Sequence, residues 1–173
     1  MTGKRLLPLL LPGLALALIA GCTRSRPSPV VDDDPEPRQV SVAELAKELA
    51  DRDPDVRFAV VLQLRRLGPK AADAVPALTK ALRDRDLNVR SSAADALASI
   101  GPAAAPAVPA LMEALKDSDS DMRRAAAAAL GAIGPAAGKA VAALQMTIRA
   151  DQDEEVRRLA RQALRRIESS PTS

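Results

Sequence analysis

The 173-residue sequence predicts an all-α fold, a solenoid of about eight helices that stack in pairs. Residues of one type recur at intervals of 33, as Leu49, Leu82 and Leu115 do, and a fixed interval of this length is typical of stacked repeats. Each interval contains two apolar patterns of helical period, separated by a Gly-Pro pair that would end a helix. These pairs are at 68–69, 101–102 and 134–135.

Residues 1–21 have the composition of an export signal. Lys4 and Arg5 precede an apolar run of 15 residues at 6–20. That run is shorter than the roughly 20 residues that a membrane-spanning helix needs, whereas a basic start and a short apolar core are typical of a signal peptide.

The signal ends in Ile19-Ala20-Gly21-Cys22, which resembles the lipobox of bacterial lipoproteins. The resemblance implies cleavage before Cys22, diacylglycerol on its thiol and anchoring in a membrane. Thr23 stands where an aspartate would retain the protein at the inner membrane, so the outer membrane is favoured if the organism has two. The alternatives are an ordinary secreted protein with a leftover thiol and a retained anchor.

Residues 22–40 predict a flexible tether, because they combine four prolines and the acidic run Asp32-Asp33-Asp34 with almost no apolar periodicity. Residues 169–173 predict a disordered tail. The repeats therefore occupy residues 41–168.

Two kinds of helix alternate within the repeats. The first kind begins at a capping aspartate, whose carboxylate can accept from free amides of the first turn, and ends at the Gly-Pro pair. The second kind carries Val75, Leu78 and Leu82, repeated 33 residues later, with Pro76 in its first turn.

The ends and the last pair depart from the regular pattern. Ser41 and Glu44 form a capping box that begins a lone second helix, and residues 153–168 match a lone first helix. In the third pair Ala142 replaces the proline, which predicts an unbroken helix from about Ala136. The repeat also gains one residue there, which we expect in the loop at 149–155.

In one complete repeat, residues 82–102 begin Leu82-Arg-Asp-Arg-Asp-Leu-Asn-Val-Arg and end Gly101-Pro102, and Ala107-Val-Pro-Ala-Leu follows. This pattern resembles the short bacterial HEAT repeat, the type also found in phycobilisome lyase subunits. The resemblance implies a right-handed α-superhelix, with the second helices lining its concave side. It implies no single activity.

If the second helices line a concave side, a candidate binding face follows. Basic residues recur at the ends of these helices and could attract an acidic protein segment, while cations in a last turn also simply complement the helix dipole. Methionines on the same face are adaptable contacts. The candidate residues are Lys47, Thr79, Lys80, Arg83, Met112, Glu113, Lys116, Gln145, Met146 and Arg149.

Four Asp and Arg pairs recur with the repeat. In the HEAT resemblance such residues pair along the stack, so we expect a structural ladder rather than an anion site. Its residues are Asp53, Arg57, Asp86, Arg90, Asp119, Arg123, Asp153 and Arg157.

The composition excludes much chemistry. The chain has no His and one Cys, so no imidazole base and no His or Cys metal cluster can form, and we expect neither metal nor cofactor. It has no Trp or Tyr for base stacking. Removing Lys4 and Arg5 with the signal leaves 23 basic against 22 acidic side chains, a net charge near +1, which does not favour nucleic acid as a partner.

These observations predict a non-enzymatic, membrane-tethered scaffold that binds a protein or peptide partner in the bacterial cell envelope. Two alternatives stay open, an enzyme subunit related to phycobilin lyases and a purely structural envelope protein. Deoxyhypusine hydroxylase is also built from HEAT repeats, but its iron ligands come from His-Glu motifs. This chain has no histidine and cannot supply them.

Overall fold

The structure is a computed structural model that describes residues 40–169. The predicted signal peptide 1–21, the lipidated Cys22, nearly all of the tether 22–40 and the tail beyond Ser169 lie outside the described residues. Within them every regular element is helical. The first helices are α2 (Pro54–Leu67), α4 (Leu87–Ile100), α6 (Ser120–Ile133) and α8 (Glu154–Glu168), and the second helices are α1 (Val42–Glu48), α3 (Val75–Ala81), α5 (Val108–Ala114) and α7 (Val141–Ala150).

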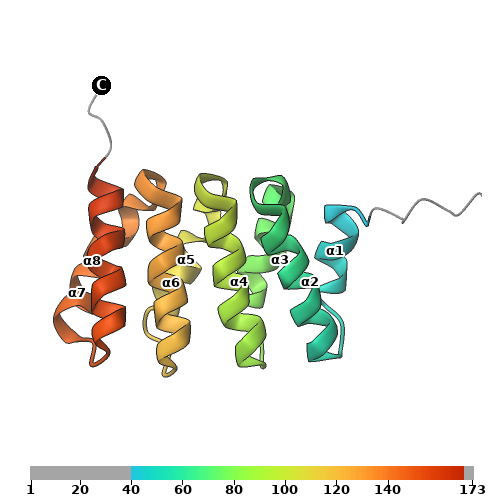
Figure 1. The fold of residues 1–173 in the computed structure, drawn as a ribbon, viewed down its shortest axis with the longest axis horizontal. Coiled ribbons are helices and arrows are strands. Elements are labelled where there is room, and N and C mark those ends of the chain that lie inside the picture. The colour runs from blue at the N-terminus through green and yellow to red at the C-terminus, as the bar shows by residue number, and fades with distance from the viewer. Residues whose placement is uncertain (1–39, 170–173) are drawn as a thin grey trace, which may run out of the picture. The chain divides into compact units, whose positions relative to one another are not determined.

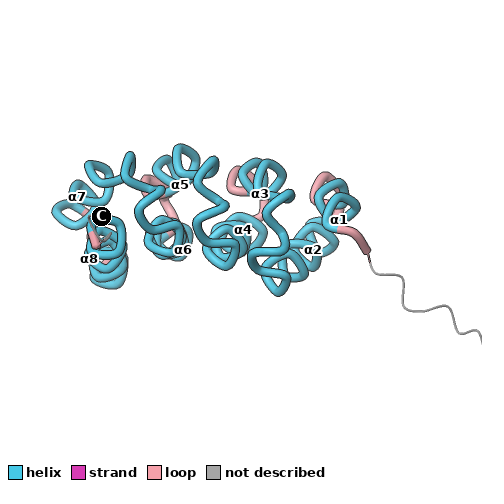
Figure 2. Tube along the Cα trace, turned by 90° about the horizontal axis from the view of Figure 1, so that it is seen from above, coloured by secondary structure: helices cyan, strands magenta, loops and turns pink. Residues whose placement is uncertain are grey.

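The helices form two layers. Figure 1 shows α2, α4, α6 and α8 side by side in one row, and Figure 2 shows the second helices in another row beside them. Each first helix packs on the neighbouring first helices and on the second helix that precedes it in the chain. The predicted all-α solenoid is confirmed.

Each first helix begins as its sequence predicts. The side chains of Asp53, Asp86, Asp119 and Asp153 accept hydrogen bonds from first-turn amides. At α1 the capping box forms, because Ser41 Oγ accepts from the Glu44 amide and Glu44 accepts in return from the Ser41 amide.

Three of the first helices, α2, α4 and α6, end at glycines that take up positive φ. Gly101 has φ of 74° and Gly134 of 70°, a conformation that costs other residues energy because of Cβ contacts. Short 3₁₀ segments follow, η1 (Gly68–Ala74), η2 (Gly101–Ala107) and η3 (Gly134–Ala140).

Two predictions about the third pair are wrong. The helix does not run unbroken from Ala136, because Ala137 has non-helical angles (φ −89°, ψ 16°) and α7 begins only at Val141. Ala71 in η1 shows nearly the same angles, so the break belongs to the buried alanines of the segment and not to the proline. The extra residue does not lengthen the loop either, since α7 stays helical to Ala150.

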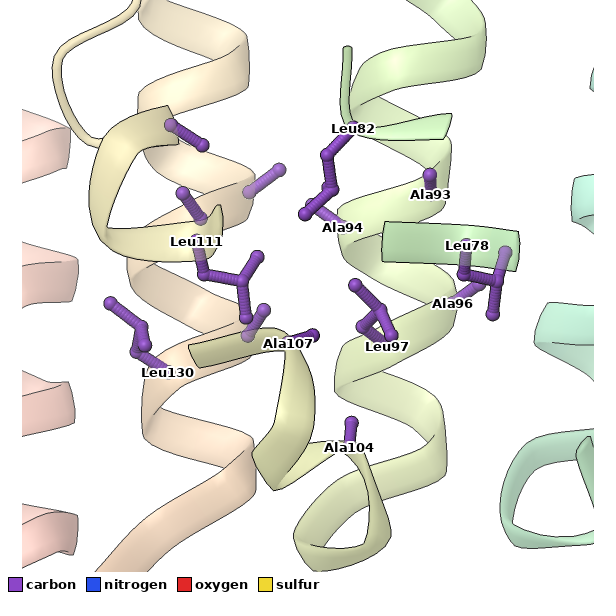
Figure 3. Packing of buried hydrophobic residues seen from close by; sticks show 14 of the residues in the cluster. Leu78, Leu82, Ala93, Ala94, Ala96, Leu97, Ala104, Ala107, Leu111 and Leu130 are labelled. Atoms are coloured by element: carbon purple, nitrogen blue, oxygen red, sulfur yellow. The ribbon is translucent and has the colours of Figure 1, made fainter. Parts of the chain in front are cut away.

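The core lies between the layers and is rich in leucine and alanine, with valine and isoleucine among them. Leu78, Leu97, Leu111 and Leu130 have no exposed surface (Figure 3). The alanines let first helices approach closely, and at Gly131 even a Cβ atom would stand 2.9 Å from Ala163 Cα. Close packing of this kind fixes the spacing of successive repeats.

One stretch of the described residues, Ser120–Ala150, is long and apolar enough to cross a membrane by length and composition. It comprises α6, η3 and α7, it bends at Gly134, and half of its most apolar part is buried in the solenoid. Its apolar character is that of a core.

Candidate functional site

The predicted binding residues lie on the second helices and their C-terminal turns. Lys47, Lys80 and Arg83 are exposed, and Met146, with 71% of its surface exposed, is the most open of the three large hydrophobic residues that are exposed among the described ones. Gln145 and Arg149 are also exposed. We call this surface the second-helix face.

Other predicted residues on that face are already engaged. Thr79 Oγ1 donates to the Val75 carbonyl at 2.7 Å, and Met112 packs partly against the core. Lys116 Nζ lies 3.1 Å from Glu113 Oε1. The basic stripe that the sequence predicts is therefore interrupted at α5.

Grooves separate successive second helices. The groove between α1 and α3 has a volume of about 300 Å³ and an apolar floor of Ala46, Leu49, Ala77 and Ala81. The groove between α3 and α5 is smaller, about 180 Å³. Lys80 stands at the first groove, whereas Arg83 and Glu113 stand at the second.

A third groove, of about 520 Å³, opens where the α1–α2 and α3–α4 loops meet. Its lining includes the carboxylates of Asp51 and Asp84 and five cationic side chains, a formal charge of +3. The cationic residues are Arg52, Arg57, Lys80, Arg83 and Arg85. The positive charge of the face is thus concentrated near its N-terminal end.

The arginine ladder runs along the loops that join second to first helices. Arg57 donates from Nε and Nη2 to both carboxylate oxygens of Asp84, at 2.7 and 2.6 Å. Arg123 does the same to Asp151, at 2.8 and 3.0 Å. These planar, paired contacts are the strong form of an ion pair, and they hold the pKa of Asp84 and of Asp151 below the usual range.

The middle pair is looser. Arg90 Nε lies 3.7 Å from Asp117 Oδ2, and that buried nitrogen has no hydrogen-bond acceptor in the described structure. Arg90 Nη1 still donates to the Asp84 carbonyl at 3.0 Å.

The ladder's acceptors differ from those that the sequence suggested. The capping aspartates hold the helix N-termini, and the arginines instead bind Asp84, Asp117 and Asp151, two residues earlier. These acceptors also recur at intervals of 33 or 34, so the signal was present in the sequence. Arg157, in the last repeat, pairs with Glu154 of its own helix.

Asp153 and Asp95 are among the further carboxylates with shifted pKa values on the first-helix side. Hydrogen bonding from Arg124 lowers the pKa of Asp153 to about 2. Burial raises the pKa of Asp95, and Arg65, 3.8 Å away, only partly offsets that rise. Both are partnered by an arginine across neighbouring first helices, an arrangement that ties repeats together.

No group of three or more metal-binding side chains occurs among residues 40–169. The features that remain in this part of the chain are the grooves, their charged rims and the ladder. This arrangement can bind an extended or helical segment of another chain.

The solved structures to which this chain is similar include helical repeat proteins. An engineered protein from a structural genomics consortium is 31% identical, with a TM-score of 0.64 over 74% of this chain and 62% of its own. A designed armadillo repeat protein in complex with the peptide (KR)4 has the same TM-score at 21% identity, over 73% and 64%. The CpcE–CpcF complex of phycocyanin lyase from Nostoc sp. PCC7120 has a TM-score of 0.50 at 22% identity, over 84% and 71%.

The first of these structures is longer than this chain, which spans 62% of it. No curated protein sequence matches this chain. The profile of HEAT repeats, however, matches residues 42–108 and 103–165, which together include every second helix and nearly all of α8. The chain therefore belongs to the HEAT repeat family.

Proposed function

We propose that this HEAT-repeat chain is a lipid-tethered, non-catalytic scaffold that binds a protein or peptide segment on its second-helix face, in the bacterial cell envelope. The observation that carries the proposal is the series of open grooves between α1, α3 and α5, with alanine floors and charged rims. Alternating apolar floors and charged rims suit a peptide's alternating side chains.

The similar architecture of the designed armadillo repeat protein, which was solved with a peptide, supports this mode of binding. The second-helix face of this chain carries exposed cationic side chains, which do not suit a basic peptide. Lys80 and Arg83 form no ion pair within the described residues, so the N-terminal grooves favour an acidic segment.

Site-specific photocrosslinking tests the binding face. A photoreactive residue in place of Met146 or Lys80 should crosslink a discrete envelope protein in intact cells. The same residue in place of Gln162, on α8 in the first-helix layer, is the matched control. Equal products from both faces, or none from either, would count against the proposal.

The anchor rests on the lipobox-like sequence at Cys22 and has its own test. Cys22→Ala should abolish palmitate labelling and release the protein from membranes, because several acyl chains are needed for stable attachment. Membrane retention of the unlabelled variant would contradict lipid anchoring. It would not bear on the proposal that the second-helix face binds a partner.

A lyase-subunit function is the second candidate, favoured by the structural likeness to the phycocyanin lyase complex. Bilin absorbance that copurifies with the protein would support it. Loss of that absorbance in a Lys80→Glu variant, with the melting temperature unchanged, would assign the bilin to the second-helix face.

A further inference from the structure

The ladder has one acceptor position without a donor. Asp51 precedes Asp84 by 33 residues and lies at the middle of the same kind of loop, but no cationic side chain of residues 40–169 lies within ion-pair distance of its carboxylate. The later acceptors all face an arginine of the preceding repeat. At Asp51 the described residues contain no preceding first helix.

Asp51 is nevertheless built like the occupied positions. Its Oδ1 accepts from the Asp53 amide at 2.8 Å, and its carbonyl accepts from Arg57 Nη1 at 2.9 Å.

The corresponding bonds at Asp84, from the Asp86 amide and from Arg90, measure 2.9 and 3.0 Å. The carboxylate of Asp51 is therefore oriented before a ligand arrives, which lowers the ordering cost of binding a guanidinium. Asp84 binds Arg57 although Arg83 and Arg85 flank Asp84 in the sequence. A neighbouring cation such as Arg52 therefore does not prevent Asp51 from binding an arginine.

A helix face next to Asp51 is uncovered as well. Val56 is 38% exposed and Ala59 is exposed, whereas the residues 33 positions later, Val89 and Ser92, are 0% and 9% exposed. In Figure 1, α2 ends the row of first helices, whereas α4 is covered on both sides. A first helix that packed here would bury Val56 and Ala59 and bring an arginine to Asp51.

We propose that the N-terminal end of the repeats binds an amphipathic helix of another protein, which places an arginine on Asp51 and small apolar side chains on Val56 and Ala59. The internal pairs give the recognition pattern. In these three pairs the arginine is followed four residues later by a buried apolar residue, Val61 after Arg57, Ala94 after Arg90 and Ala127 after Arg123.

A second copy of this chain does not fit. The last first helix, α8, carries Arg157 at the ladder position, but Arg161 stands four residues later, where a small apolar residue is required, and both arginines pair with Glu154. The residue of this chain at the matching interval is Arg24, within the Pro-rich segment whose sequence predicts a tether and not a helix. The partner helix is therefore expected from a different protein.

The probe is a fluorescent peptide with the sequence of residues 86–101, which carries Arg90 and Ala94 in the required pattern. Its anisotropy is measured with the full chain in detergent. We expect saturable binding that Asp51→Asn weakens by about tenfold or more and that Ala59→Arg abolishes. The exposed Asp73→Asn on η1 is the matched control and should bind as the original does.

Because a 16-residue peptide is a marginal helix by itself, a grafted chain provides a second measurement. A copy of residues 86–107 inserted before Val42 places an arginine 27 residues ahead of Asp51, the interval that separates Arg57 from Asp84. Asp51→Asn should lower the melting temperature of the grafted chain by about 3 °C or more and leave the ungrafted chain unchanged.

An equal effect of Asp51→Asn in both chains, together with peptide binding that ignores Asp51 and Ala59, overturns the proposal. Met146, on α7, lies far along the row from this end, so a negative result here does not bear on photocrosslinking at Met146.

Discussion

Arg57 and Arg123 each form hydrogen bonds to two successive loops at once. Arg123 donates from Nη1 to the Asp117 and Ser118 carbonyls of its own loop, and from Nε and Nη2 to Asp151 of the next. A lysine could not replace it, because only a planar guanidinium offers donors in both directions. The Asp151 carboxylate meanwhile accepts from the Asp153 amide, so one side chain also organises the turn.

These carboxylates make stability depend on acid pH. Hydrogen bonds from arginine lower the pKa of Asp84 and Asp151 in the folded chain, and that of Asp153 to about 2. A lowered folded pKa contributes stability that is fully present above the unfolded value of about 3.9 and is lost as pH falls through the folded value. We expect a melting temperature that is flat above pH 5 and falls between about pH 4 and pH 2.

Thermal unfolding followed by circular dichroism across this range measures the effect. The double variant Asp84→Asn, Asp151→Asn should have a lower melting temperature at neutral pH and a shallower acid decline. Asp95→Asn is the control, because burial raises the pKa of Asp95 and its ionisation therefore acts in the opposite direction. A decline that is equally steep in the double variant would contradict the assignment.

At the scale of elements, α6 and α8 approach each other closely at Gly131. A Cβ atom at Gly131 would stand 2.9 Å from Ala163 Cα and 3.1 Å from Ala163 Cβ, so backbone would have to shift. Gly131→Ala should therefore destabilise the fold by about 1–3 kcal/mol, as overpacking does, in urea unfolding.

Gly138→Ala is the matched control. Nothing lies within 4 Å of a Cβ at Gly138, and its φ is not positive, so the substitution should be neutral or stabilise by about 0.4–1 kcal/mol. Equal effects of the two substitutions would mean that the α6–α8 contact is looser than described.

The elements also show what sequence reasoning can and cannot supply. Caps and stops are local, so Asp86 and Gly101 marked the ends of α4 directly. The break before α7 depends on how Ala137 and Ala140 pack into the core, and the absence of a proline at Ala142 therefore misled the prediction.

The candidate site divides in the same way. The period placed the basic residues on the second helices, but it did not reveal that Lys116 pairs with Glu113 or that Thr79 bonds to its own helix. The acceptors of the ladder arginines, such as Asp84, recur with the same period as the capping aspartates, so spacing alone does not say which of the two series the arginines bind. The three-dimensional register of neighbouring loops decides it.

For the whole molecule, stability should depend on neighbouring repeats. A chain that ends at Gln152 lacks α8 and loses the burial of Val156 and Ile167, among others. Since each such side chain stabilises by about 1.5–3 kcal/mol, we expect the melting temperature to fall by about 10 °C or more. Scanning calorimetry against a chain that ends at Ser169 measures this, and equal melting temperatures would contradict it.

The loose pair between Arg90 and Asp117 has a mechanical consequence. The pairs on either side of it are bidentate, whereas its Nε–Oδ2 separation is 3.7 Å. When tension is applied along the row of repeats, we expect the Arg90–Asp117 pair, between α4 and α6, to separate before the two bidentate pairs.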